Sequence, residues 1–228
     1  MKPATLVTAL ATGTAVAGAG YWMVRRAREA PRALPPSYYI PIVTPIIDMP
    51  FAEDVLAILE RITGDEVTLL LHTYGGSVTA SVLIANALRN FPRSRAIVPY
   101  LASSGGTLIA LNASELHMGR NAALSAVDPV LGGGLRARDV PHDEPSAALR
   151  SIASQYGDAV TDFLRQTLVR RRIQAPSVDV DRAMAAFLGD HAPHDWPISR
   201  AEVEHLGLPV GPAPLAWAQR VDEHRRRW

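Results

Sequence analysis

Two glycine-containing turns carry the residues that could form and stabilise an acyl intermediate. Residues 102–107 read Ala-Ser-Ser-Gly-Gly-Thr, and the small neighbours allow a serine to lie on a sharp turn. The helix expected after this turn presents free N–H groups and positive partial charge, which suits an oxyanion. Residues 73–77 contain a second glycine pair, whose backbone can approach a substrate closely. Together these parts match the needs of nucleophilic acyl transfer.

Alternating apolar patterns place both turns at the ends of strands. The expected strands cover 38–47, 66–71, 95–101 and 115–118, and the expected helices cover 51–62, 78–88 and 104–112. The first strand contains two prolines, which is typical of an edge strand. This order predicts an α/β fold with a mostly parallel sheet and ligand chemistry at the carboxyl ends of its strands.

The second half of the chain is less regular. Asp128-Pro129 is followed by a glycine-rich stretch that predicts a mobile loop up to residue 144. Residues 146–172 predict an arginine-rich helix, of a kind that often forms oligomer contacts or a lid. Ser199 and Glu202 have the spacing of a helix capping box, and a short strand is expected at 208–210.

Composition excludes several kinds of site. The formal net charge is +1 and the basic residues do not form a broad stripe, so we expect no nucleic-acid partner. There is no cysteine, and the only lysine is Lys2. His191 and His194 have no third convergent ligand in the sequence, so we expect no metal and no cofactor.

The first residues predict a membrane segment. Residues 4–24 carry no charge, and a helix of that length spans the hydrocarbon core of about 30 Å. Tyr21 and Trp22 followed by arginines favour an anchor over a cleaved signal peptide, for which residues 15–17 offer a small-residue cleavage site. The excess of arginine after the helix predicts a single-pass protein with its soluble domain in the cytoplasm.

Several blocks of the sequence, in this order, resemble the serine dehydrogenase proteinase family. That family groups with the Clp proteolytic subunit, signal peptide peptidase A and the crotonases. The blocks are residues 70–76, 98–100 with 102–111, 118–119, 127–129, 194–198 and 206–210.

The resemblance implies a Clp/crotonase-like spiral of βαβ units, here preceded by one transmembrane helix. It also implies a serine endopeptidase that works without a cofactor on protein or peptide substrates, associates with a membrane and forms homo-oligomers. On this interpretation residues 1–27 are the anchor, 28–37 a linker and 38–228 the protease domain.

Matched residue by residue, the resemblance makes Ser104 the nucleophile, with Ser103 as the adjacent alternative. It assigns the oxyanion hole to the backbone N–H groups of Gly76 and Gly105. Tyr74 departs from the family, which has proline at this position.

The absence of lysine from the domain narrows the choice of residue for the general base. Signal peptide peptidases of this group use a lysine base, which the domain does not contain, and arginine remains protonated. His194 matches the family's His-Asp-aromatic-Pro-Ile block, and we expect it to be the general base. Two alternatives stay open: His194 has only a structural role, or His142 is the base instead. Asp128 is the preferred orienting carboxylate, because a histidine cannot easily pair with the aspartate that directly follows it. Asp190 and Asp195 remain alternatives.

Two other functions compatible with the fold remain open at this point. The first is a catalytically inactive scaffold that kept the fold, for which the departure at Tyr74 leaves room. The second is a crotonase-like acyl-CoA enzyme, which would use the same oxyanion turns but would not need Ser104.

Overall fold

A five-stranded parallel sheet forms the centre of the molecule. The structure, a computed structural model, describes residues 39–190 and 192–226. The strands follow the order β1-β2-β3-β5-β8, and every neighbouring pair is parallel. They are β1 (Tyr39–Val43), β2 (Glu66–His72), β3 (Arg93–Val98), β5 (Glu115–Met118) and β8 (Val210–Pro212). The predicted α/β fold with a mostly parallel sheet is confirmed.

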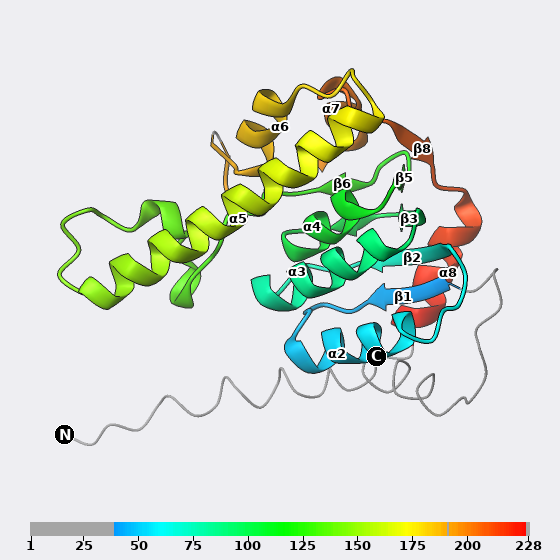
Figure 1. The fold of residues 1–228 in the computed structure, drawn as a ribbon, viewed down its shortest axis with the longest axis horizontal. Coiled ribbons are helices and arrows are strands. Elements are labelled where there is room, and N and C mark those ends of the chain that lie inside the picture. Colours follow the sequence, from blue (N-terminus) through cyan, green and yellow to red (C-terminus); the bar gives the residue numbers. More distant parts are fainter. Residues whose placement is uncertain (1–38, 191, 227–228) are drawn as a thin grey trace.

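Helices cover both faces of this sheet, as a parallel sheet requires. The helices are α2 (Met49–Leu59), α3 (Val78–Ala87), α4 (Gly105–Asn112), α5 (Ala147–Gln174), α6 (Val180–Phe187), α7 (Arg200–His205) and α8 (Leu215–Arg225). Figure 1 shows α2, α3 and α4 side by side, with α5 running obliquely above them. On the other face, Val221 of α8 packs against Val43, Leu70 and Ile97. The capping box predicted at Ser199 is present at the start of α7.

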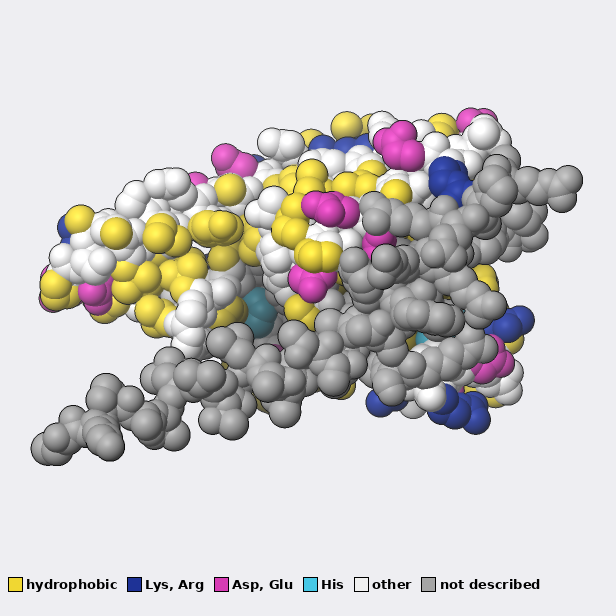
Figure 2. Space-filling model, turned by 90° about the horizontal axis from the view of Figure 1, so that it is seen from below, with side chains coloured by type: hydrophobic (Ala, Val, Ile, Leu, Met, Phe, Trp, Pro, Cys, Tyr) yellow, Lys and Arg dark blue, Asp and Glu magenta, His cyan; other side chains and the backbone are white. Residues whose placement is uncertain are grey.

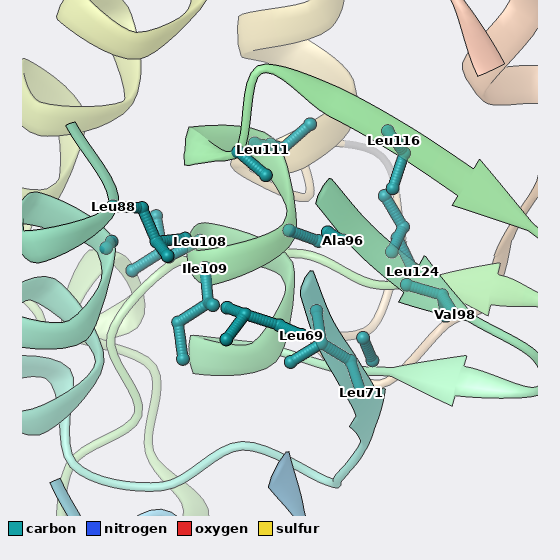
Figure 3. Close-up of a cluster of buried hydrophobic side chains, with 14 of the residues drawn as sticks. Leu69, Leu71, Leu88, Ala96, Val98, Leu108, Ile109, Leu111, Leu116 and Leu124 are labelled. Atoms are coloured by element: carbon teal, nitrogen blue, oxygen red, sulfur yellow. The ribbon is translucent and has the colours of Figure 1, made fainter. Parts of the chain in front are cut away.

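The main core lies between the sheet and α4 (Figure 3). Leu69 and Leu71 of β2 point to this side, whereas Leu70 between them points toward α8, as strand alternation requires. All residues of α4 are buried, and its Leu108 and Ile109 lie among these strand side chains. The turn before α4 is therefore fixed by a helix that is enclosed on every side.

A second, smaller sheet stands at the carboxyl edge of the first. It consists of β4 (Leu101–Ala102), β6 (Ala123–Leu124) and β7 (Ile198–Ser199). A bridge between Thr73 and Ala102 connects it to the chain that leaves β2. The prediction of one continuous strand over 95–101 is wrong, because β3 ends at Val98 and β4 belongs to the other sheet. Pro99 lacks the N–H that would continue the ladder.

The first half of α5 projects beyond both sheets together with the preceding loop (Figure 1). That loop contains short 3₁₀ turns at Gly132–Gly134 and Ala137–Asp139. The hydroxyl of Ser146 caps α5 by accepting the N–H of Leu149 at 3.2 Å. Apolar side chains cover much of this projecting part in Figure 2, and Ile152 and Tyr156 of α5 are exposed.

The prediction of a single-pass membrane protein with its domain in the cytoplasm is corrected. No helix within residues 39–190 and 192–226 combines the length and the apolar character needed to cross a bilayer. The segment 1–27, expected to form the anchor, and the linker 28–37 lie outside the described residues. The predicted anchor rested on the absence of charge in a stretch composed largely of alanine, glycine and threonine.

His72 makes the stability of this fold depend on pH. Burial, followed by repulsion from Arg225, lowers the pKa of His72 to about 4, although Asp222 opposes the shift. As pH falls below about 6.5, His72 binds a proton in the unfolded chain but not in the folded chain. Its contribution to the free energy of unfolding is therefore fully present above this pH and is lost as pH decreases toward 4. We expect a loss on the order of 2 kcal/mol between pH 7.5 and 4.5.

Urea denaturation at the two pH values measures this loss. His72→Gln should show a smaller loss than the wild type, whereas replacing the exposed His205 by glutamine should leave the loss unchanged. An equal pH dependence in His72→Gln and the wild type would contradict the assignment.

Candidate active site

Three strand ends meet at one edge of the small sheet. Strand β4 ends shortly before Ser104, and the parallel strand β6 ends shortly before Asp128. Strand β7 runs antiparallel to β6, so its beginning lies at this same edge, and His194 shortly precedes it. The small sheet therefore gathers a serine, an aspartate and a histidine from three distant parts of the chain.

Ser104 has an unusual backbone conformation. Its φ of 52° and ψ of −116° make it the only non-glycine residue with positive φ among the described residues. It occupies the N-cap of α4, where the first N–H groups of the helix have no partner within the helix. Such strain persists only where the surroundings enforce it, and it is concentrated at functional sites. Ser103 is buried, whereas Ser104 is partly exposed.

The two glycine turns are in direct contact. A Cβ on Gly75, whose φ is 99°, would lie 2.6 Å from the Cβ of Ser104. A Cβ on Gly105 would lie 3.8 Å from the backbone nitrogen of Gly76 and would collide with the hydroxyl of Ser81. Within the described part of the chain, the N–H groups of Gly76 and Gly105 donate no hydrogen bond. Both donors are therefore available beside Ser104.

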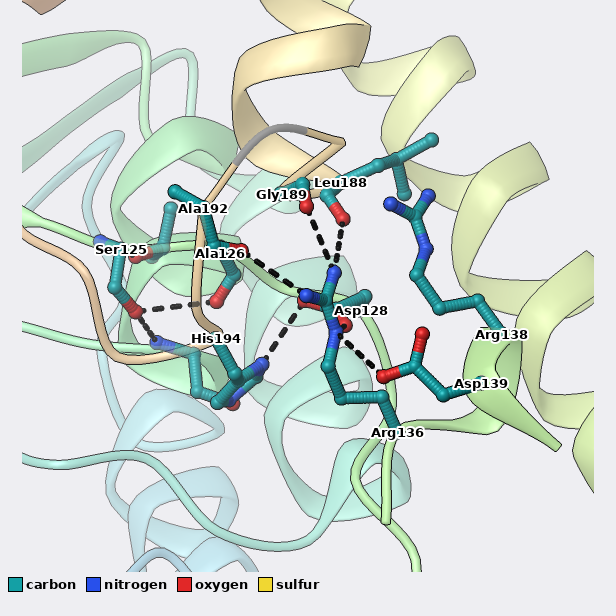
Figure 4. A network of polar contacts seen from close by, with 12 residues as sticks. Ser125, Ala126, Asp128, Arg136, Arg138, Asp139, Leu188, Gly189, Ala192 and His194 are labelled. Carbon is teal, nitrogen blue, oxygen red and sulfur yellow. Dashed lines mark hydrogen bonds and ion pairs between the residues drawn. The ribbon is translucent and has the colours of Figure 1, made fainter. Parts of the chain in front are cut away.

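Asp128 and His194 form a hydrogen-bonded pair (Figure 4). The Nδ1 atom of His194 lies 2.9 Å from Oδ1 of Asp128, and the aspartate side chain is only 4% exposed. Burial alone would raise the pKa of Asp128, but hydrogen bonds and charges from His194 and Arg136 outweigh it, and the pKa falls below its ordinary value. An ionised carboxylate only accepts, so Nδ1 donates, and Nε2 of the neutral ring is left able to take a proton.

Arg136 holds this pair to the chain segment that precedes His194. Its Nε lies 2.6 Å from Oδ2 of Asp128. Its remaining N–H groups donate to the carbonyl oxygens of Ala192, Leu188 and Gly189, at 3.0, 3.3 and 2.8 Å. Figure 4 shows the guanidinium between these carbonyl groups and the carboxylate. One arginine thus connects the segment of Asp128 with the segment that leads to His194.

Among the described residues, no hydrogen bond or ion pair joins the other candidates from the sequence to this pair. Asp190 forms an ion pair with Arg138 at 2.7 Å, and Asp195 is exposed. His142 is exposed and lines a cavity of about 430 Å³ between the projecting loop and α5. Asp128 contributes to the wall of the same cavity. Within the residues that the structure describes, no group of three or more His, Cys, Asp or Glu side chains could hold a metal ion.

The sequence did not indicate Arg136. It follows a loose glycine-rich stretch, with Arg138 two residues further on, and neither arginine has a distinguishing pattern. Its role depends on contacts to residues more than fifty positions away. The hydrogen bond from Val127 N–H to the carbonyl oxygen of Phe187 at 2.7 Å brings the two segments together beside it.

Comparison with known families and proteins gives consistent matches. A family model described as ClpP-like SDH-type serine proteinase matches residues 37–213. Two uncharacterized proteins of Methanocaldococcus jannaschii, MJ0137 and MJ1495, are 32% identical over 175 residues and 29% identical over 177 residues. Each match covers 70% of this chain, but only 58% and 57% of those proteins. The chain thus spans less than two thirds of the length of these relatives.

Solved structures with a similar fold include two proteases. The 1510-N membrane-bound stomatin-specific protease matches with a TM-score of 0.57 and 15% identity, over 80% of this chain and 83% of that one. ClpP1 from Listeria monocytogenes matches with a TM-score of 0.52 and 13% identity, over 86% of this chain and 97% of that one. At these identities the likeness concerns the fold alone.

Proposed function

Because the chain belongs to the family of ClpP-like SDH-type serine proteinases, we propose that it is an endopeptidase that cleaves peptide bonds through an acyl-enzyme on Ser104. One observation carries the proposal: a partly exposed serine with positive φ stands at the head of a buried helix, at the same sheet edge as a hydrogen-bonded aspartate–histidine pair. A scaffold that only kept the fold has no use for this strained serine. A crotonase-like acyl-CoA enzyme would not need it either.

The proposed reaction assigns one role to each residue. Nε2 of His194 takes the proton from Oγ of Ser104 while the oxygen attacks the scissile carbonyl carbon. Asp128 stabilises the positive charge that forms on the histidine. The N–H groups of Gly76 and Gly105 stabilise the negative oxygen of the tetrahedral intermediate.

The intermediate then collapses and the peptide C–N bond breaks. His194 returns its proton to the departing amine, which leaves an ester between Ser104 and the acyl half of the substrate. Water, deprotonated by His194, attacks this ester and releases the second product with Ser104 restored. The cycle needs no redox partner and no cofactor.

We further propose that the protein acts as a homo-oligomer on peptide or protein substrates. Exposed apolar side chains on α5, among them Ile152, Tyr156 and Ile173, support an association between copies.

Labelling with a fluorophosphonate probe tests the function directly. The full chain should form a covalent adduct on Ser104, detected by mass spectrometry of peptides. Ser104→Ala should abolish labelling, because no other described serine combines positive φ with partial exposure at this edge. Ser103→Ala serves as the neighbouring control and should retain most of the labelling.

The controls also define failure. A folded wild type that is never labelled, at any protein concentration, would contradict the proposed protease. Labelling that disappears in Ser103→Ala and persists in Ser104→Ala would instead move the nucleophile by one residue.

A further inference from the structure

The buried hydroxyl of Ser125 contacts the backbone of the strained serine. Ser125 directly follows β6 and has no exposed surface. Its Oγ accepts the N–H of Ser104 at 2.9 Å and donates to the carbonyl oxygen of Ala126 at 3.1 Å. Figure 4 shows Ser125 beside Ala126, in the same close-up as Asp128 and His194. Both hydrogen-bonding functions of the hydroxyl are therefore used.

Thr107 fixes Ser125 from the other side. The N–H of Ser125 donates to Oγ1 of Thr107 at 3.1 Å, and this hydroxyl donates to the carbonyl oxygen of Ala102 at 2.7 Å. Thr107 is also fully buried. The hydrogen bonds thus connect the residues on both sides of Ser104 with the end of β6, and every donor in the connection has a defined acceptor.

The conformation of Ser104 explains why a side chain is needed here. Its positive φ interrupts the regular backbone at the point where β4 changes into α4. Ser103 N–H donates to Thr73 and Gly106 N–H donates to Ser103, whereas the N–H of Ser104 reaches only the Ser125 hydroxyl. A half-buried N–H that loses its acceptor is unfavourable, so removing this hydroxyl favours other conformations of the turn.

We propose that Ser125 is a positioning residue for the nucleophile, an inference that rests on the proposed function of Ser104. Its hydroxyl holds Ser104 in the conformation that presents Oγ for attack. Because it also occupies the Ser104 N–H, this N–H does not serve the oxyanion, and stabilisation is left to Gly76 and Gly105. Ser125 further connects the nucleophile with the segment that ends at Asp128.

Ser125→Ala is the test variant. Its rate constant for fluorophosphonate inactivation at saturating probe should fall by about 10- to 100-fold, while the concentration for half-saturation stays unchanged. The pH dependence of the rate should keep its shape, because the contact between His194 and Asp128 does not involve Ser125. If Ser125 had a merely structural role, its loss would not lower the inactivation rate constant while leaving both the half-saturating concentration and the pH dependence unchanged.

Ser114→Ala provides a matched control. The Ser114 hydroxyl also accepts a backbone N–H, from Ser94 at 2.9 Å, and donates to a backbone carbonyl oxygen at 2.8 Å. It lies at the start of β5, away from the second sheet. This variant should lose thermal stability to a similar degree but keep the wild-type inactivation rate.

Amide hydrogen exchange of Ser104, measured by NMR, separates this proposal from the proposed function. Exchange should be faster in Ser125→Ala than in the wild type, whether or not the protein reacts with the probe. Unchanged exchange, or an equal loss of inactivation rate in Ser114→Ala, would overturn the positioning role. A wild type that shows protected exchange but never reacts would overturn the protease assignment alone.

Discussion

His194→Ala is expected to slow the acylation of Ser104 by about 10³- to 10⁴-fold. The proton of the serine hydroxyl then loses the acceptor proposed for it at the edge where β4, β6 and β7 meet. Inactivation by a fluorophosphonate, followed from pH 5 to 9, measures the effect.

The exposed His142 supplies the comparison for this experiment. It lies on the projecting loop and faces the cavity that Asp128 also lines. His142→Ala should react at the wild-type rate. If His142→Ala loses the activity and His194→Ala keeps it, the base belongs to the loop and the proposed pair has only a structural role.

Arg136→Met is expected to destabilise the fold by about 3–5 kcal/mol and to lower activity strongly. The variant leaves the buried Asp128 without its guanidinium partner, and three carbonyl groups lose their donor. Urea denaturation at pH 7 measures the change in the free energy of unfolding. Arg138→Met is the matched control, because its ion pair with Asp190 is partly exposed and should contribute at most about 1 kcal/mol.

The same variant changes the response to acid. In the wild type the lowered pKa of Asp128 gives stability that is present above its ordinary value near 3.9 and is lost as pH falls through the lowered value. Without Arg136, burial opposes ionisation with less compensation, so the carboxylate binds a proton at higher pH. Acid unfolding should therefore begin at a higher pH in Arg136→Met than in Arg138→Met. Equal behaviour of both variants would contradict the role given to Arg136.

Local sequence patterns were sufficient to predict those helices, strands and turns whose structure is determined by neighbouring residues in the chain. Apolar runs predicted β2 and β5, and small residues around Ser104 predicted a sharp turn before a helix, as found. The apolar pattern failed to predict the end of strand β3, because the apolar run continues through Pro99 whereas the strand ends before it. Helix α6 was missed, although its buried residues Val180, Ala183, Met184 and Phe187 recur at helical spacing.

The residues gathered at the sheet edge of Ser104 could be predicted only in part. The resemblance directed attention to Asp128 and His194, and the structure brings these two side chains into contact. Arg136 and Ser125 could not be found in this way, because their roles depend on hydrogen bonds to backbone groups of other segments. A backbone carbonyl or N–H leaves no trace in residue types, so such contacts are invisible in one sequence.

The pairing of β6 with β7 has a consequence for the order in which the protein becomes active. Ser104 and Asp128 leave the ribosome early, but His194 follows much later, and β7 comes after it. On the proposed assignment, a nascent chain or a fragment that ends before residue 194 contains the nucleophile without its base. Proteolysis would then begin only after the segment around His194 has been synthesised, and until that point the growing chain would be protected from its own active site.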